Sequence, residues 1–318
     1  MTNALTRMLL GRLGGLLLTL FLASVVIFSA VLLTGDPIAA LAGGAKPTPE
    51  LVAQIRADYH LDDPVWTRYW LWLSGVLHGD FGRSFIYKTD VMTLVAPRFG
   101  ITLELVILTV LLILIFGVGS GILAATRGRA VDRTVSILTS LGMALPTFVV
   151  AILLIWIFAK SLGWFPVYGE GSGFWDRIWH LILPAVSLAV LFLAYISRIT
   201  RSSLVAQLHS EHVDTARVRG IPRQRIFAVH VFRNASPQIL AIAGTTVAGL
   251  FAASAIAEVA FGVGGIGALL VQASARADLP VVQIISLLLV TIFVVLNAIA
   301  DLISAVIDPT SVGGGSRA

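Results

Sequence analysis

The chain has 318 residues, of which 57% are hydrophobic and only 12% are charged, and its mean hydropathy is +0.93. A soluble domain carries about 25% charged residues, so this composition excludes an ordinary soluble protein and indicates a membrane protein. The net charge of +5 does not indicate nucleic-acid binding, because the basic residues lie beside hydrophobic runs, and the absence of cysteine excludes disulfides and thiolate metal sites.

Six apolar runs are long enough to cross a bilayer. A helix rises about 1.5 Å per residue, so roughly 20 residues cross about 30 Å of hydrocarbon. The predicted spans are residues 13–33, 105–125, 134–159, 178–197, 235–257 and 279–300. A further apolar run, residues 259–275, is shorter and contains four glycines, so we expect a bent or re-entrant segment there. The predicted fold class is an all-α membrane protein with six transmembrane helices.

Basic residues predict the orientation of these spans. The N-terminus, residues 126–133, residues 198–236 and the C-terminus together carry thirteen Lys and Arg, whereas the short loops at 160–177 and 258–278 carry three. By the positive-inside rule, both termini lie in the cytosol. The first span has too long an apolar run for a cleaved signal peptide, so we expect it to remain as an anchor.

Residues 34–100 form the largest predicted external segment, and we expect it to be partly helical. Pro49 precedes a helix-like stretch at residues 51–59, and Trp66, Tyr69, Trp70 and Trp72 then cluster within seven positions. Such a cluster is typical of a helix that lies at the membrane surface. A second interpretation is a collar that receives a substrate-delivery protein, and the sequence leaves both interpretations open.

The predicted cytosolic loop at residues 201–236 is polar and basic, and it is interrupted by Gly220 and Pro222. Glycine suits the end of one helix and proline the first turn of the next, which predicts a helix, a tight turn and a second helix. Val213 and Ala216, with a residue at position 205 or 206, fall near helical spacing and form a narrow apolar stripe. We expect this stripe to need a partner, either another protein or anionic lipid.

Several residues inside the spans have a structural and a functional explanation of equal weight. Pro146 and Pro184 are expected to kink their helices, which either shapes a translocation cavity or reflects ordinary packing. Gly117 and Gly121 have the spacing of close helix contacts, as do the glycines at positions 11 and 15.

The chain lacks the sequence of a nucleotide site or a hydrolytic centre. None of its three lysines follows glycine, so the phosphate-binding Gly-x-x-x-x-Gly-Lys pattern is absent. Gly262, Gly264 and Gly267 match a dinucleotide-binding spacing, but no alternation of strands and helices surrounds them. We therefore expect no enzymatic activity and no cofactor or metal in this chain.

Four short motifs stand near the ends of the predicted spans. They are Leu33-Thr34-Gly35-Asp36-Pro37, Asp214-Thr215-Ala216-Arg217-Val218-Arg219-Gly220, Arg233-Asn234-Ala235, and Glu258-Val259-Ala260-Phe261 leading into Gly265-Ile266-Gly267. The closing motifs are Arg276-Ala277-Asp278-Leu279-Pro280, Asn297 and Asp308-Pro309. Over nearly its whole length the chain thereby resembles the permease subunits of the dipeptide, oligopeptide and nickel branch of ABC importers. It departs from them at Gly264, where relatives usually carry proline.

This resemblance implies a type I importer permease fold, in which a glutamate-alanine-alanine-spacer-glycine motif forms a coupling helix that docks a separate ATPase. Asp214 stands at the glutamate position, Thr215 and Ala216 at the two alanines, and Gly220 at the glycine. The expected ATPase-docking residues are Glu211, Asp214, Thr215, Ala216, Arg217, Arg219, Gly220 and Pro222.

Two further sets of residues are candidates for the transport path. Glu258, Phe261, Gly265 and Gly267 are expected at an external gate or turn. Asn297 and Asp301, near the cytosolic end of the last span, either line the pathway or bond between helices.

The resemblance also implies partners and a location. The expected partners are a second homologous permease, forming a heterodimer, two ATPase subunits or domains that bind ATP and Mg, an extracellular or periplasmic substrate-binding protein, and membrane lipid, but no nucleic acid. The expected location is the bacterial cytoplasmic membrane. The predicted division is a first helix at 1–33, an external segment at 34–100, a core at 101–310 and a tail at 311–318.

The predicted function is translocation of di- or oligopeptides by alternating access, driven by the separate ATPases. Nickel chelates, haem and glutathione are alternative cargoes, because the binding protein usually selects the substrate. A secondary transporter coupled to an ion gradient ranks lower, since the spans are nearly free of acidic groups and show no obvious inverted repeat.

Overall fold

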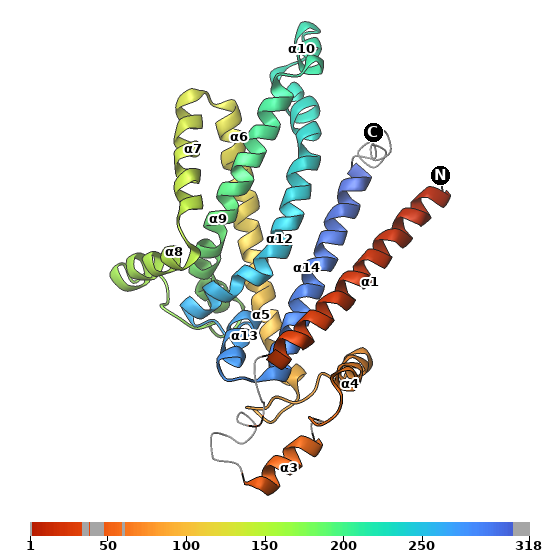
Figure 1. The fold of residues 1–318 in the computed structure, drawn as a ribbon. Coiled ribbons are helices and arrows are strands. Elements are labelled where there is room, and N and C mark those ends of the chain that lie inside the picture. The colour runs from red at the N-terminus through yellow and green to blue at the C-terminus, as the bar shows by residue number, and fades with distance from the viewer. Residues whose placement is uncertain (1, 34–37, 39–47, 59–60, 308–318) are drawn as a thin grey trace. The chain divides into compact units, whose positions relative to one another are not determined.

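The computed structural model describes residues 2–33, 38, 48–58 and 61–307. Residues 34–37 and 308–309, which belong to two of the sequence motifs, and the predicted tail at 311–318 lie outside the described residues. Within those ranges every named element is a helix, and an isolated bridge joins Arg83 and Asp90. The elements in chain order (Figure 1) are α1 (Thr2–Leu33), α3 (Pro49–Asp58), α4 (Val65–His78), α5 (Val91–Leu112), η1 (Ile113–Val118), α6 (Gly119–Thr126), α7 (Arg129–Ala144), α8 (Thr147–Leu154), η2 (Ile155–Ser161), α9 (Phe174–Leu208), α10 (Glu211–Val218), α11 (Arg223–Arg225), η3 (Ile226–Phe232), α12 (Arg233–Phe261), α13 (Ile266–Ala275) and α14 (Leu279–Ile307).

Among the described residues, five continuous helices are candidate membrane spans, and a bent helix pair would make a sixth if it is one span. The five helices are long and apolar enough to cross a membrane, and each overlaps a run predicted from sequence: Gly14–Leu33, Val91–Thr126, Phe174–Leu208, Arg223–Phe261 and Leu279–Ile303. The helices predicted at residues 51–59 and around the tryptophan cluster are also present, as α3 and α4. The all-α fold class is therefore confirmed.

The prediction of one continuous helix at residues 134–159 is wrong. α7 and the helix formed by α8 and η2 meet at an angle of 102°. Leu145 and Pro146 at the break have extended backbones, with ψ of 122° and 142°. Proline has no amide hydrogen to donate and disfavours the helical conformation of the residue before it, which explains the break. Pro184 does not end its helix, because α9 runs through it for 35 residues.

The described part of the chain contains three π-helical segments: η1 and η3 stand between α-helical segments, and η2 ends the helix that begins with α8. A π-helical turn contains an extra residue, so it rotates the side chains that follow it relative to a regular α-helix. The apolar runs of the sequence do not predict these segments. In two spans, Val91–Thr126 and Arg223–Phe261, η1 and η3 therefore rotate the faces of α6 and α12 relative to the helices that precede them.

One compact unit combines residues 1–102 with residues 264–295. Its buried core consists of Val91, Val95, Ile266, Leu269, Ala273, Val281, Ile284 and Ile285. Asp278 is fully buried here and accepts hydrogen bonds from the Ser84 hydroxyl at 2.5 Å and from the Phe85 amide at 2.9 Å. A buried carboxylate is costly unless it is hydrogen-bonded, so these two donors fasten the loop after α4 to the start of α14.

The second unit combines residues 103–263 with 296–318, and α9 is its central helix. A Cβ atom added to Gly121 would lie 2.6 Å from the Cβ of Thr200 on α9, and one added to Gly117 would lie 3.2 Å from the Leu193 carbonyl oxygen. The close helix contact predicted for these two glycines is therefore confirmed. At positions 11 and 15 no atom of the described chain comes within 4 Å of an added Cβ.

An ion pair connects α7 to α9 in this unit. The Arg201 guanidinium donates to both carboxylate oxygens of Asp132, with 2.7 Å between Nη2 and Oδ2. One turn earlier on α9, Arg198 Nη2 donates to the Ser140 hydroxyl at 2.6 Å. These contacts hold one arm of the bent pair against the helix that leads directly into α10.

Candidate functional site

The predicted helix-turn-helix at residues 201–236 is present. Ser210 precedes α10 with an extended backbone, and α10 begins with acidic residues in its first turn, as the positive end of a helix dipole favours. Gly220, with φ of +71°, follows the last turn; its amide bonds the Arg217 carbonyl at 3.0 Å and the Ile221 amide bonds the Ala216 carbonyl at 3.2 Å. This is the Schellman arrangement that favours glycine. Pro222 then directly precedes α11.

The apolar stripe of α10 is covered by the chain itself. Val213 and Ala216 are buried in a cluster with residues of α9, η3 and α12, namely Leu204, Ile226, Val231, Ala235 and Ile239. The expectation that this stripe needs an outside partner is therefore wrong, because η3 and α12 fold back beneath α10. Ala216, one of the predicted docking residues, anchors α10 and does not present its side chain to a partner.

The opposite face of α10 is exposed. Glu211, Asp214, Thr215 and Val218 lie on this face by helical spacing, and Val218 is 89% exposed. Arg217, also exposed, donates to Asp214 at 2.8 Å and to the Leu208 carbonyl at 3.3 Å. Arg219, Gly220 and Pro222 are exposed at the turn that follows. We call Glu211, Asp214, Thr215 and Val218 the outer face of α10.

A polar cluster ties α10 to the junction of η3 and α12. The His212 Nε2 atom lies 3.1 Å from the His230 carbonyl oxygen, so it carries the hydrogen of that bond. Asn234 Nδ2 donates to the same oxygen at 2.9 Å and lies 3.2 Å from His212 Nε2. The Ser210 hydroxyl is also 3.2 Å from that nitrogen. We call Ser210, His212, His230 and Asn234 the His212 clasp. It joins the start of α10 to the first turn of α12.

The predicted gate residues lie on either side of a sharp turn. Glu258 and Phe261 are buried at the end of α12, where the Ser254 hydroxyl donates to Glu258 Oε1 at 3.0 Å. Gly262 ends this helix with φ of +62°, and the Val263 amide bonds the Glu258 carbonyl at 2.8 Å. Gly265 and Gly267 belong to the start of α13, a helix of only ten residues. The bend expected within residues 259–275 is therefore present, and α13 is shorter than a membrane span.

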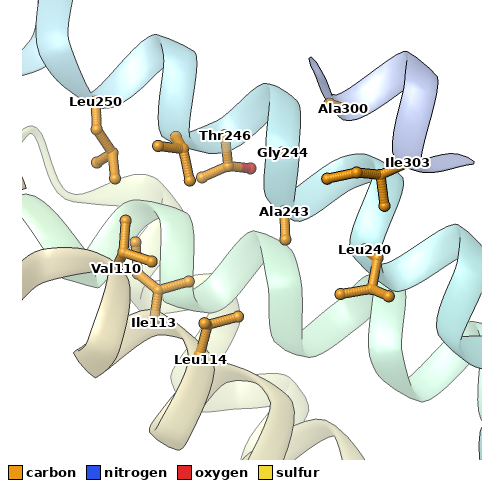
Figure 2. Close-up of a pocket in the computed structure, with 11 residues that line it drawn as sticks. Val110, Ile113, Leu114, Leu240, Ala243, Gly244, Thr246, Leu250, Ala300 and Ile303 are labelled. Atoms are coloured by element: carbon orange, nitrogen blue, oxygen red, sulfur yellow. The ribbon is translucent and has the colours of Figure 1, made fainter. Parts of the chain in front are cut away.

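An apolar cavity of about 210 Å³ lies in the second unit (Figure 2). Side chains of α5, η1, α12 and α14 line it: Val110, Ile113, Leu114, Leu240, Ala243, Gly244, Thr246, Val247, Leu250, Ala300 and Ile303. The hydroxyl of Thr246 donates to the Ile242 carbonyl at 2.8 Å. The cavity therefore suits an apolar group and offers no acid or base for chemistry.

The two predicted pathway residues, Asn297 and Asp301, flank Ala300 on α14 but do not line this cavity. Asp301 is exposed and Asn297 is half-buried. Their place on the translocation path stays a prediction. Among the residues that the structure describes, no group of three or more histidine, aspartate or glutamate side chains is arranged to hold a metal ion.

Two family matches cover most of the chain. Residues 117–311 match the family described as "Binding-protein-dependent transport system inner membrane component", and residues 5–106 match the N-terminal region of the same kind of membrane component. The chain belongs to this family. It is the permease subunit of an ABC importer.

Named relatives agree with this assignment. The permease is 37% identical to "Oligopeptide transport system permease protein OppB" of Escherichia coli over 294 residues, which is 92% of this chain and 94% of that protein. It is 35% identical to "Probable peptide ABC transporter permease protein y4tP" of Sinorhizobium fredii over 306 residues, or 95% and 97% of the two chains.

Two solved structures share the fold. An inward-facing structure of the MetNI methionine ABC transporter matches with a TM-score of 0.55 and 18% identity, over 68% of this chain and 97% of that one. An amino acid ABC transporter with histidines matches with a TM-score of 0.50 and 17% identity, over 68% and 92%. The type I permease fold expected from the sequence motifs is therefore confirmed.

Three residues of the α10 region are not indicated as functional by the sequence of this permease. Val218, which is 89% exposed, belongs to the docking motif but not to the expected docking residues, although its spacing from Glu211 and Asp214 places all three on one side of a helix. His212 and Asn234 stand 22 positions apart and meet only because α12 returns to α10. No local pattern connects them.

Proposed function

We propose that the permease is the membrane-spanning subunit of a peptide importer and that the outer face of α10 docks a separate ATPase subunit. The observation that carries the docking proposal is the exposure of Val218 on a short helix whose other side is already anchored in the chain. One exposed apolar side chain is common on protein surfaces. Here it supports docking because it stands on an anchored cytosolic helix of a chain whose family implies a separate ATPase.

The proposed mechanism is alternating access. Two ATPase subunits close on ATP and Mg, α10 moves with one of them, and the membrane helices change from inward-facing to outward-facing; hydrolysis then allows their return. In this scheme the permease performs no bond chemistry and binds no cofactor. It works beside a second homologous permease and receives cargo from an extracellular substrate-binding protein, with both termini in the cytosol, as the distribution of basic residues predicts.

The proposed cargo is a di- or oligopeptide, because the relatives named above carry peptide or oligopeptide in their names. Nickel chelates, haem and glutathione are the alternatives from the wider family. Uptake of labelled peptides, a nickel chelate, haem and glutathione should be compared in cells with and without this gene. Loss of peptide uptake alone would support the proposal, and unchanged peptide uptake with loss of another cargo would overturn it.

A single substitution tests the docking surface. Val218→Glu places a charge on the outer face, at the C-terminal end of α10, while leaving the buried cluster under α10 intact, so copurification of the ATPase subunits should fall. Ala206→Glu adds the same charge at an exposed position of α9, outside the outer face, and serves as the control. Ala216→Glu is unsuitable because Ala216 is buried. Equal recovery of the ATPase with Val218→Glu and with the unaltered permease would contradict docking at this face.

A further inference from the structure

Helix α4 in the first unit has one apolar side packed against α1. The hydroxyls of Tyr69 and Ser24 are 2.8 Å apart in a buried hydrogen bond, and the rings of Tyr69 and Phe28 lie 5.4 Å apart in an edge-to-face contact. Trp72 lies 5.6 Å from Phe28, and Trp72 and Val76 pack against the core of the same unit. The four clustered aromatic residues therefore do not share one role.

A second apolar side of α4 is uncovered. Trp66, Trp70 and Leu77 are 69%, 56% and 76% exposed. At about 100° per residue these three positions fall within roughly 40° of one another, beside the Tyr69 side of the helix. Thr67, Leu71 and His78 lie on the side opposite Tyr69, where Leu71 is 51% exposed between polar neighbours. We call Trp66, Trp70 and Leu77 the α4 shoulder.

The position of α4 on α1 indicates what covers the shoulder. Its contacts on α1 are Phe21, Ser24 and Phe28, and all three lie inside the apolar span Gly14–Leu33. On the same span, Leu22 and Val26 are 54% and 65% exposed, as expected for side chains that face lipid. α4 therefore lies beside a part of α1 that contacts hydrocarbon, and its shoulder continues the apolar surface of that helix.

The length and the ends of α4 show that it does not cross the bilayer. Its 14 residues extend about 21 Å, which is short of the roughly 30 Å of hydrocarbon. Asp62 and Asp63 precede it, Gly79 ends it in a left-handed conformation, and Asp80 follows. With acidic residues at both ends, each end favours water. A helix of this kind lies along the interface with its apolar side among the acyl chains, where tryptophan is enriched.

We propose that α4 is inserted along the membrane interface, with the α4 shoulder in contact with lipid acyl chains. Of the two interpretations that the sequence leaves open for this segment, the structure favours the membrane helix over a collar for a substrate-delivery protein. The inference depends on the membrane insertion of α1 and does not depend on the ATPase or on the cargo.

Single cysteines in this cysteine-free chain can test the proposal. Leu77→Cys and Trp66→Cys place a nitroxide spin label on the shoulder, and His78→Cys, next in sequence to Leu77 but turned by about 100°, is the matched control. The complete transporter is reconstituted in phosphatidylethanolamine and phosphatidylglycerol bilayers. Collision of each label with dissolved oxygen, which concentrates in lipid, is compared with collision with a water-soluble nickel chelate.

We expect oxygen collisions to exceed chelate collisions at positions 66 and 77, and the order to reverse at position 78. Addition of the substrate-binding protein should change neither shoulder site. Chelate access at 66 and 77 that is lost on adding the binding protein would overturn the proposal in favour of a collar, and exclusion of both reagents would indicate a protein subunit over the shoulder. A second test needs no cysteine, because brominated acyl chains quench the fluorescence of tryptophans that contact them. If Trp66 and Trp70 contact lipid, the double variant Trp66→Phe and Trp70→Phe should lose part of the fluorescence that brominated lipid quenches.

Discussion

If α10 docks the ATPase, replacement of His212 by leucine should leave the ATPase bound but weaken the transmission of its movement to the membrane helices. Leucine removes the bond of 3.1 Å to the His230 carbonyl oxygen and the contact with Asn234, but leaves the outer face and the buried cluster of α10 unchanged. An intramolecular hydrogen bond contributes about 0.5–1.5 kcal/mol net, and a loss near 1 kcal/mol corresponds to roughly a fivefold change in an equilibrium constant. We therefore expect peptide uptake per ATP hydrolysed to fall by up to about fivefold, with the ATPase still bound.

The assay measures peptide uptake and phosphate release in the same vesicles containing the complete transporter. His212→Gln retains an amide donor that can reach the His230 carbonyl, so it should restore much of the ratio. His209→Leu is the control, since His209 bonds the Val205 carbonyl of its own helix at 2.9 Å. An unchanged ratio in His212→Leu, or the same loss in His209→Leu, would refute a specific role for the clasp.

Two further substitutions test the packing around α9. Asp132→Arg places two positive charges side by side and should lower the thermal stability and the uptake activity of the transporter. Combining it with Arg201→Asp restores an ion pair and should recover both properties. No recovery would mean that the ion pair is not the reason for the loss. Gly121→Leu forces a side chain against the backbone and side chains of α9 and should cost about 1–3 kcal/mol or more in stability. Gly119→Leu is the control, because a Cβ atom added at Gly119 meets no atom of the described chain within 4 Å; it should cost much less by the same thermal measurement.

The sequence was sufficient to predict features that depend on neighbouring residues. Long apolar runs predicted the crossings, and Gly220 and Pro222 predicted the turn after α10, because each of these residues acts through its own backbone geometry. Proline alone did not predict which helix breaks, because a kink was expected at both Pro146 and Pro184. Pro146 lies at the 102° break between α7 and α8, whereas Pro184 lies inside the continuous helix α9. The surrounding packing therefore decides whether a proline breaks its helix.

Features that depend on distant residues were not predicted. The spacing of Val213 and Ala216 predicts an apolar stripe on α10. It does not show what buries the stripe, because Ile226 and Val231 of η3 reach it only through the fold of the chain. The docking role of the exposed residues and the pathway role of Asn297 and Asp301 remain predictions.

The bond between Ser84 and Asp278 links residues separated by 194 positions and has a consequence for biogenesis. The first 102 residues belong to a unit whose core is completed by Val281, Ile284 and Ile285. At about 5–20 residues per second, a ribosome needs roughly 10–40 s to add the intervening segment of about 180 residues. During this interval the early helices are already available for insertion, but the buried partners of α5 do not yet exist. Nascent chains stopped before residue 278 should therefore be open to proteases and chaperones along the loop at 80–90.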